Sequence, residues 1–329
     1  MPMMWLGVMD IVDKSILWEL AVNCRCSLQS VANKLELSVN AVKKRIAKLT
    51  EIGIIQGYQI YPSLSMMDAE TSLALLKTKE PTFDNEILDN IGKHPLIYAG
   101  SILTNGDILL FNHYRSTAEL DELGSYLRRV ESVTDVEFHT LLAEKGGRCE
   151  LKTMHLKLLR CLLEDVRMSI SDLSRCSGLT PRRVRILLEE FSPGGAEPET
   201  YLSQKTPGDL RTKQACFYFQ VVRDLNAGGY TAFIIRIHHE GGAETRGKIV
   251  ENLREQYPFA FFYAYTSAFE PILFCVFVVE HMRDGNIILT AMRQIPGITS
   301  TQALYGYPTK RYPGLFDSFF EEKLKALQK

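Results

Sequence analysis

Apolar residues recur with helical spacing in two stretches of the chain that align with each other. Residues 13–46 align with residues 155–188 without a gap, at an offset of 142 positions. Apolar positions fall on apolar positions along the alignment, as in the pairs Ile16 and Leu158, Leu20 and Leu162, and Val42 and Val184. Packing constrains core positions more tightly than surface ones, so this pattern indicates a decayed duplication.

Each of these stretches predicts three short helices. In the first stretch they cover residues 13–22, about 28–35 after the N-cap Ser27, and a segment that begins after Ser38. Helix, short turn, helix is the layout of a helix-turn-helix unit.

The residues around the third helix support this interpretation. In the second stretch this helix begins after Thr180, and Pro181 then falls at the first helical position, where no N–H group is needed. In the first stretch Gly53 ends the helix, and residues 51–62 predict a short hairpin. A hairpin at this place would make the unit winged.

Strands follow both helical stretches in the order βαββαβ, which is the order of a ferredoxin-like domain. The first set predicts a strand at 71–79, a helix at 83–93, a hairpin at 96–114, a helix at 116–130 and a strand at 133–141. The second set predicts a strand at 230–238, a helix at 244–256, a hairpin at 259–280, a helix at 283–294 and a strand at 297–305.

The predicted fold class is therefore α+β, with two winged helix-turn-helix domains alternating with two ferredoxin-like βαββαβ domains. The offset between the copies grows from 142 to 159 positions, which places an insertion near 192–214, rich in Gly, Pro and polar residues. The expected domains are 1–62, 66–146, 150–222 with the inserted loop 192–214, 228–308, and a C-terminal helical tail at 309–329.

Composition and charge restrict the possible partners. The 329 residues are 46% hydrophobic and 23% charged, with a net charge of −1, so nucleic-acid binding would need a local basic patch. No apolar run approaches the roughly 18 residues of a membrane helix. Seven cysteines without a CxxC pair predict reduced thiols and a cytoplasmic location. Because the sequence shows no second pair of metal ligands, we favour a structural role for Cys24 and Cys26 over metal binding.

The third helix of the first copy has a basic face. Val39, Val42, Ile46 and Leu49 form one stripe that should face the core, and Asn40, Lys44 and Ala47 lie opposite. Asn pairs with adenine and Lys with guanine, while flanking cations reach phosphates. A solvated basic face is the alternative interpretation. The predicted DNA-binding residues are Ser38, Asn40, Lys43, Lys44, Arg45 and Lys48.

The second copy differs on the same face. By the constant offset, Ile186 replaces Lys44, while Glu189 and Glu190 replace Ala47 and Lys48. Carboxylates are repelled by phosphates, so we interpret this helix as degenerate and expect Ile186 to be buried against a neighbouring domain or partner. A possible second DNA contact is the group Arg182, Arg183 and Arg185, which could instead pair with the glutamates.

The chain resembles the Lrp/AsnC family of feast/famine transcription regulators over residues 12–58, which read VDKSILWELAVNCRCSLQSVANKLELSVNAVKKRIAKLTEIGIIQGY. The resemblance covers about 1–145 well and 150–310 more weakly, as a second copy. It implies a βαββαβ domain of the RAM type that serves dimerisation and binds an amino acid or a related small molecule. Here the paired sheets could come from one chain, as an intramolecular pseudo-dimer, or from a homodimer.

The resemblance also implies an effector site at the turn before the third strand, where the family has a Gly-x-x-Asp pattern. The match is partial: Asp107 fits, Thr104 stands at the expected Gly, and Gly106 is displaced. A turn residue that binds nearby N–H groups is the alternative interpretation of Asp107.

An enzyme is the rival class, because siroheme decarboxylases resemble this fold and some have two such halves fused. That group implies a Tyr-x-Arg-x-His-like stretch on the second strand, but residues 98–103 and 262–267 contain neither Arg nor His. A protein-interaction scaffold without DNA binding is a further alternative. We predict a DNA-binding transcription regulator that acts on double-stranded DNA, with no catalytic residues, cofactor, metal or membrane.

Overall fold

The computed structural model describes residues 9–81, 84–193, 214–258, 260–306 and 309–325. The chain divides into two compact units. The first unit contains the chain up to Met66, Glu144–Tyr230 and the residues from Glu322 onward, and the second contains Met67–Ala143 and Thr231–Glu321. None of the helices that the structure describes has the length and apolar character needed to cross a membrane.

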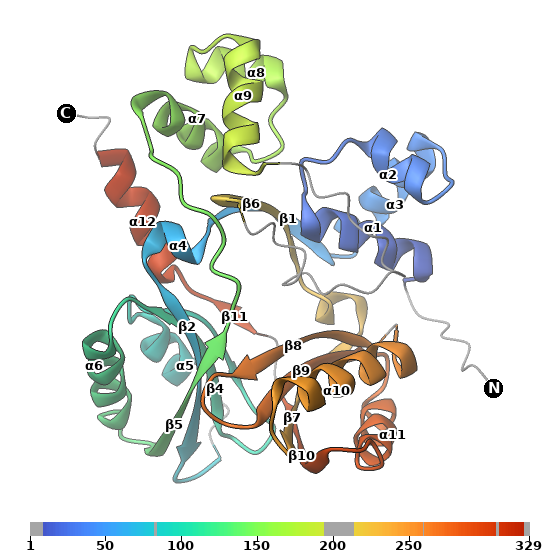
Figure 1. Ribbon diagram of the computed structural model, residues 1–329, viewed down its shortest axis with the longest axis vertical. Helices are drawn as coiled ribbons and strands as arrows, with labels where there is room; N and C mark the ends of the chain where they lie inside the picture. The colour runs from blue at the N-terminus through green and yellow to red at the C-terminus, as the bar shows by residue number, and fades with distance from the viewer. Residues whose placement is uncertain (1–8, 82–83, 194–213, 259, 307–308, 326–329) are drawn as a thin grey trace. The chain divides into compact units, whose positions relative to one another are not determined.

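The first unit contains both helix-turn-helix motifs (Figure 1). In the first motif the helices are α1 (Ile11–Val22), α2 (Leu28–Lys34) and α3 (Val39–Glu51). Each helix begins where the sequence supplies a cap: the side chains of Asp10, Ser27 and Ser38 accept hydrogen bonds from backbone N–H groups in the first turns.

The second motif repeats this arrangement with α7 (Thr153–Glu164), α8 (Ile170–Ser177) and α9 (Pro181–Phe191). The Ser169 side chain caps α8, and the Thr180 side chain caps α9 in front of Pro181. Gly178 ends α8 with a φ of +70°, a conformation that favours glycine. The three-helix pattern expected from the sequence is therefore present twice.

The predicted wing hairpin of the first motif is wrong. Residues Ile55–Pro62 form one strand, β1, which pairs antiparallel with β6 (Phe217–Arg223) of the second motif. Tyr58 lies opposite Val221, and Ile60 lies opposite Phe219. A strand satisfies its backbone groups with whichever edge is available, and duplication within one chain supplies an edge from the other copy.

The second unit contains two βαββαβ sets. The first set is β2 (Glu70–Thr78), α5 (Asn85–Gly92), β3 (Ile97–Ile102), β4 (Ile108–Tyr114), α6 (Thr117–Arg128) and β5 (Val133–Leu142). The second set is β7 (Thr231–His239), α10 (Ala243–Gln256), β8 (Phe261–Ser267), β9 (Ile272–Val279), α11 (Met282–Met292) and β10 (Ile298–Tyr305). The remaining elements are α4 (Leu64–Met67), a 3₁₀ turn at Asn226–Gly228, β11 (Lys310–Arg311) and α12 (Gly314–Lys325).

The two sets join in one sheet with the strand order β10-β7-β9-β8-β5-β2-β4-β3-β11. Each set has the ferredoxin-like order, which confirms the predicted fold class. The sets meet where β5 pairs with β8, with Leu141 opposite Ser267. The strand β11, which follows β10 in the chain, pairs back onto β3 of the first set. The pairing of the two copies is therefore intramolecular in this structure.

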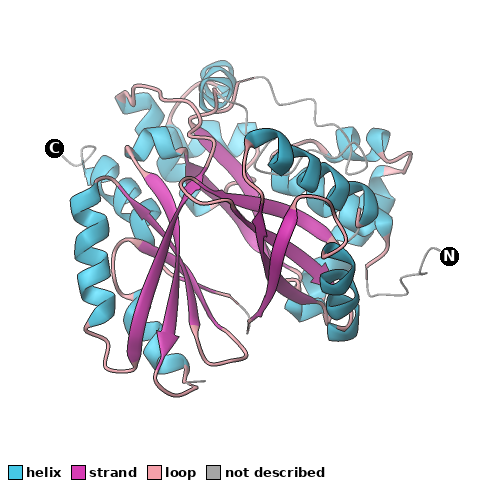
Figure 2. Cartoon of the chain, turned by 60° about the horizontal axis from the view of Figure 1, so that its bottom comes forward, coloured by secondary structure: helices cyan, strands magenta, loops and turns pink. Residues whose placement is uncertain are grey.

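The strands bury apolar side chains on both faces. One core cluster combines side chains of both sets, including Leu73, Phe111, Ile234 and Phe274. A second cluster lies between the strands and helices α10 and α11, and includes Ile235 and Leu253. Neighbouring residues such as Ile234 and Ile235 thus enter different cores, as the alternation of a strand requires. The two halves of this sheet face each other and carry helices on their outer sides (Figure 2).

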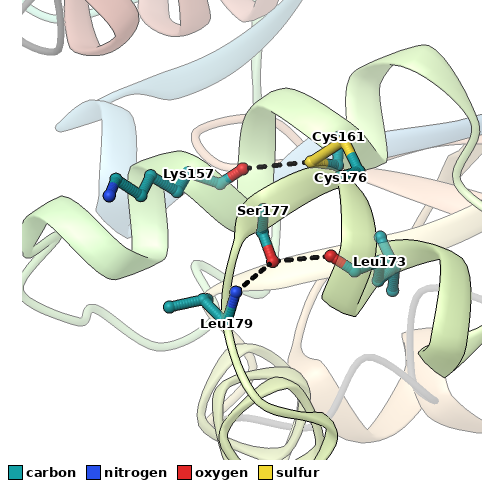
Figure 3. The surroundings of a disulfide bond; sticks show 6 residues. All are labelled: Lys157, Cys161, Leu173, Cys176, Ser177 and Leu179. Carbon is teal, nitrogen blue, oxygen red and sulfur yellow. Dashed lines mark hydrogen bonds between the residues drawn. A yellow bond between two sulfur atoms is a disulfide. The ribbon is translucent and has the colours of Figure 1, made fainter.

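The expectation that all thiols are reduced is also wrong. Cys161 on α7 and Cys176 on α8 form a disulfide within the second motif (Figure 3). The two cysteines are 15 residues apart in sequence, and the turn between the helices brings their Cα atoms to 6.1 Å. Spacing alone did not indicate the bond, because the pair is not a CxxC motif. The predicted insertion at 192–214 lies almost entirely outside the described residues.

Candidate nucleic-acid interface

Helix α3 presents the predicted basic face to solvent. Val42 and Leu49 are fully buried, whereas the residues on the opposite side are exposed: Asn40, Lys43, Lys44, Ala47 and Lys48. Among the described residues, Lys43 and Lys44 have no ion-pair partner. The wheel drawn from the sequence therefore placed these side chains on the correct face. Their role in DNA binding stays a prediction.

Arg45 differs from the other predicted contacts because it belongs to the packing of the motif. Its Nη1 atom lies 2.7 Å from Asp10 Oδ2 and 2.8 Å from Asp13 Oδ1. The hydrogen bonds to Asp13 and Asp10 raise the pKa of Arg45. The prediction that Arg45 reaches phosphates thus conflicts with an ion pair that holds α3 against α1.

Lys48 lies at the edge of the same ion-pair network. Its Nζ atom is 3.8 Å from Asp13 Oδ2, and about half of its side chain remains exposed. The Asp13 side chain is almost completely buried. The network therefore joins α3 to α1 and leaves Lys48 at the surface.

Helix α9 of the second motif has a mixed exposed face. Ile186 is 39% exposed, so no neighbouring domain among the described residues buries it, and its burial by a partner stays a prediction. Arg182 and Arg185 are also exposed, while the Nε atom of Arg183 donates to Met154 Sδ at 3.0 Å. Glu190 contacts His155 Nε2 at 2.8 Å.

Two arginines join the motifs in a related way, although the sequence analysis did not single them out. Arg25 follows α1 and donates to the carbonyl oxygens of Val166 and Met168 of the second motif. Arg167 occupies the matching position, 142 residues later, and donates to the Tyr58 hydroxyl on β1 at 3.1 Å. Burial lowers the pKa of Arg25, and the Arg167 charge acts in the same direction.

The same arginines stack on aromatic rings of the opposite strand. The guanidinium carbon of Arg25 lies 5.9 Å from the centre of the Phe219 ring on β6, and that of Arg167 lies 4.8 Å from the Tyr58 ring on β1. Phe219 on β6 therefore corresponds to Tyr58 on β1, since each ring receives the matching arginine. Tyr58 pairs with Val221, two residues after Phe219, and Phe219 pairs with Ile60, two residues after Tyr58. The junction therefore has approximate twofold symmetry within one chain.

The predicted effector residues lie in the turn between β3 and β4. Asp107 accepts from the backbone N–H of Thr78 at 3.2 Å and from the Asn105 side chain at 2.7 Å. The backbone N–H of Thr104 donates to Tyr305 of the second set, and Gly106 has a φ of +86°. These contacts give Asp107 a structural role in the turn, and an effector site there stays a prediction.

A polar cluster in the seam between the two sets was missed by the sequence analysis. His139 is buried on β5, with Nε2 at 3.0 Å from Glu137 Oε1 and Nδ1 at 2.7 Å from Glu270 Oε2. Arg236 on β7 binds both oxygens of Glu137. Burial by itself would raise the pKa of Glu137, but Arg236 and His139 lower it below its ordinary value.

This cluster has donors suited to a divalent cation, because Glu137, His139 and Glu270 each offer one ligand atom within 4.8 Å of the others. The Glu-x-His alternation at 137–139, which puts both side chains on one face of a strand, was the available signal. Glu270 and Arg236 could not be linked to it from the sequence.

Parts of the chain are similar to known DNA-binding proteins and transcriptional regulators. Residues 9–56 match the family described as winged helix-turn-helix DNA-binding. An HTH-type transcriptional regulator of Pyrococcus abyssi is 28% identical over 146 residues, which cover 42% of this chain and 97% of that protein. The HTH-type transcriptional regulator LrpA of Mycobacterium tuberculosis is 26% identical over 132 residues, covering 39% and 85%.

Two solved structures of the siroheme decarboxylase NirDL match nearly the whole chain. The siroheme decarboxylase NirDL in complex with an iron-uroporphyrin III analogue has a TM-score of 0.56 at 12% identity, over 97% of this chain and 98% of that chain. At this identity the match shows the fold alone. Together, the matched family and the regulator relatives make the chain similar to transcription regulators of the Lrp/AsnC type, and the structure shows that its three-helix motif and its ferredoxin-like domain both occur twice.

Proposed function

We propose that the chain is a transcription regulator that binds double-stranded DNA through the exposed face of α3. The observation that carries this proposal is the position of Asn40, Lys43 and Lys44 on the solvent side of the third helix of a winged helix-turn-helix motif. In such motifs the third helix enters the major groove and its N-terminal residues contact base edges. The cap at Ser38 places Asn40 in the first turn, where such a contact is made.

The roles of the individual residues follow from their chemistry. Asn40 can make two hydrogen bonds to adenine, and Lys44 can donate to guanine. Lys43 and Lys48 flank that line and suit phosphates, whereas Arg45 acts by holding α3 on α1 through Asp10 and Asp13. We assign no catalytic group or cofactor to the chain.

Binding to DNA fragments from a random pool tests this function. Lys44→Ala should weaken specific binding by about fivefold or more, because a good base contact contributes about 1–3 kcal/mol. Lys43→Ala should weaken binding to all sequences and reduce the slope of log K against log salt by about one. Lys248→Ala, an exposed lysine on α10 of the other unit, serves as the control. Binding that is indifferent to Lys43, Lys44 and salt would refute the proposal.

The fold shared with NirDL supports a weaker second candidate, an enzyme that acts on a tetrapyrrole. The described strands β3 and β8 lack the Arg and His expected for that group, although β7 carries Arg236 and His238. An absorbance titration with iron-uroporphyrin separates the two functions. A visible band shifted by the protein would favour the enzyme, and an unchanged spectrum would favour the regulator.

A small-molecule effector and a dimer of chains belong to the same proposal. Thermal unfolding with each amino acid in turn tests the predicted effector turn at Thr104, Gly106 and Asp107. Sedimentation of the full chain measures whether two chains associate. Neither sheet needs a second chain, because β1 pairs with β6 and β5 pairs with β8 within one chain.

A further inference from the structure

The two recognition helices, α3 and α9, expose different side chains at matched positions. Across the offset of 142 residues, Asn40 corresponds to Arg182, Lys43 to Arg185, Lys44 to Ile186, Ala47 to Glu189 and Lys48 to Glu190. All ten of these residues are exposed in the structure. The buried positions behave in the opposite way, because Val42 and Leu49 correspond to Val184 and Phe191, which are also buried. The scaffold is therefore kept while the exposed chemistry has diverged.

The junction described above keeps both helices in one compact unit. The β1–β6 ribbon, the bonds of Arg25 to the second motif and the bond of Arg167 to Tyr58 join the motifs from both sides. In dimeric helix-turn-helix proteins, two recognition helices related by a twofold axis bind two half-sites on one duplex. In an ordinary dimer those half-sites are equal because the subunits are equal, but here the helices differ within one chain.

We propose that α9 contacts DNA beside α3 and recognises a half-site of different sequence, so that the chain binds a non-palindromic operator in one direction. This inference rests on the proposed function. Ile186, at the position of Lys44, suits the C5 methyl group of thymine, and Arg182 in the first turn suits guanine. Arg185 flanks them and suits a phosphate.

The glutamates of α9 are compatible with this arrangement. Glu189 and Glu190 lie in the C-terminal part of the helix, whereas the N-terminal residues of a recognition helix contact the bases. The Oε2 atom of Glu190 lies 2.8 Å from Nε2 of His155, which belongs to the same motif. The basic and apolar part of α9 can therefore face the duplex while one carboxylate is held by the motif.

Selection from a random DNA pool followed by footprinting with the full chain is the first test. Two protected half-sites of unlike sequence, with a thymine in the second, are expected. A footprint of one half-site, or two identical half-sites, would overturn the inference while leaving the proposed function intact. A chain that binds no DNA at all would refute both.

Replacing the thymine of the second half-site with uracil tests the contact of Ile186, because it removes only the methyl group. The wild-type chain should bind the uracil duplex about fourfold more weakly, as expected for one buried methyl group. The variant Ile186→Ala should bind both duplexes equally. Equal loss in the wild type and the variant would overturn the assignment of Ile186.

An exchange of exposed residues is the sharpest test. The variant Arg182→Asn, Ile186→Lys, Glu189→Ala gives α9 the face of α3 without touching its buried residues, so folding should be preserved and can be checked by circular dichroism. Its selected operator should become palindromic. An operator that stays unchanged in this folded variant would show that α9 does not read DNA.

Discussion

The two winged helix-turn-helix motifs use different chemistry at the same place in the fold. In the first motif, Glu19 of α1 and Lys34 of α2 form an ion pair of 3.0 Å. The residues 142 positions later are Cys161 and Cys176, which form the disulfide between α7 and α8 (Figure 3). Both links join the first helix to the second. The link between these helices is therefore retained while the groups that make it are exchanged.

The two links should respond to different conditions. The Glu19 side chain is only 4% exposed, so its charge depends on Lys34 for compensation. Burial raises the pKa of Glu19, and the hydrogen bond and charge of Lys34 offset this in part. The disulfide carries no charge and depends on the redox conditions instead. The first motif is thus sensitive to pH where the second is sensitive to reductant.

The largest expected effect is that of Lys34→Ala. The variant should lose roughly 3–5 kcal/mol of unfolding free energy, because the Glu19 carboxylate stays buried without its partner. Urea unfolding at pH 7 measures the loss. Lys43→Ala, an exposed lysine of the same motif, should change stability by less than about 0.5 kcal/mol. Equal effects of the two substitutions would show that the Glu19–Lys34 pair is not a structural link.

The pH dependence sharpens this prediction. The folded pKa of Glu19 lies above its ordinary value, so the folded state takes up the proton first as pH falls, and stability due to this carboxyl rises through that range. Removing Lys34 raises the folded pKa further. The deficit of Lys34→Ala should therefore be largest at neutral pH and shrink as the solution is acidified toward the folded pKa. A deficit that is constant with pH would contradict the assignment to Glu19.

Removing the disulfide should have a somewhat smaller effect. A bond that closes a loop of 15 residues contributes about 3 kcal/mol in the chain-entropy model, so Cys161→Ser, Cys176→Ser should destabilise the chain by about that amount. Reductant should reproduce the loss in the wild type and change nothing in the variant. Reductant that destabilises both proteins equally would place the redox-sensitive bond elsewhere.

The arginines of the junction give a matched pair of substitutions. Arg25 donates to two backbone carbonyls, whereas Arg167 donates to one hydroxyl and stacks on Tyr58. Arg25→Ala should cost about 2–3 kcal/mol, because two partly buried carbonyls lose a charged donor, and Arg167→Ala about 1 kcal/mol. Thermal unfolding ranks the two. A reversed order would mean that the junction depends more on the stacking than on the carbonyl contacts.

The features that could be predicted from the sequence are local or repeated. The spacing of Ile16, Leu20 and their counterparts revealed the duplication, and the caps Ser27 and Ser38 marked helix starts within one residue of their places. Periodicity also identified the exposed side of α3. In each case the information lies within a few turns of the chain, where side-chain period and local hydrogen bonding determine the structure.

The features that were missed depend on partners far away in sequence. The Arg45 side chain forms ion pairs with Asp10 and Asp13 at the start of another helix. The strand β1 pairs with a strand more than 150 residues later. Periodicity tells which face of a strand is buried but not which edge it meets. The cluster of Glu137, His139 and Glu270 was invisible for the same reason, since its members belong to different copies.

The smallest expected loss of stability comes from a substitution in that cluster, which lies where the two βαββαβ sets meet. Arg236 of the second set lowers the pKa of Glu137 of the first, against the effect of burial. The stability gained is present above the unfolded pKa of about 4.3 and is lost as pH falls through the folded pKa. Glu137 is partly exposed, so Arg236→Met should cost only about 1 kcal/mol at pH 7.

Thermal unfolding between pH 3 and pH 7 measures this prediction as a difference between wild type and variant. The difference should disappear in acid, because a protonated Glu137 no longer attracts Arg236. Lys248→Met, which breaks the exposed Lys248–Glu244 pair of one helix, is the control and should show almost no difference at any pH. A difference for Arg236→Met that persists below the folded pKa of Glu137 would mean that Arg236 joins the two sets by packing, for example on Phe274, instead of by charge.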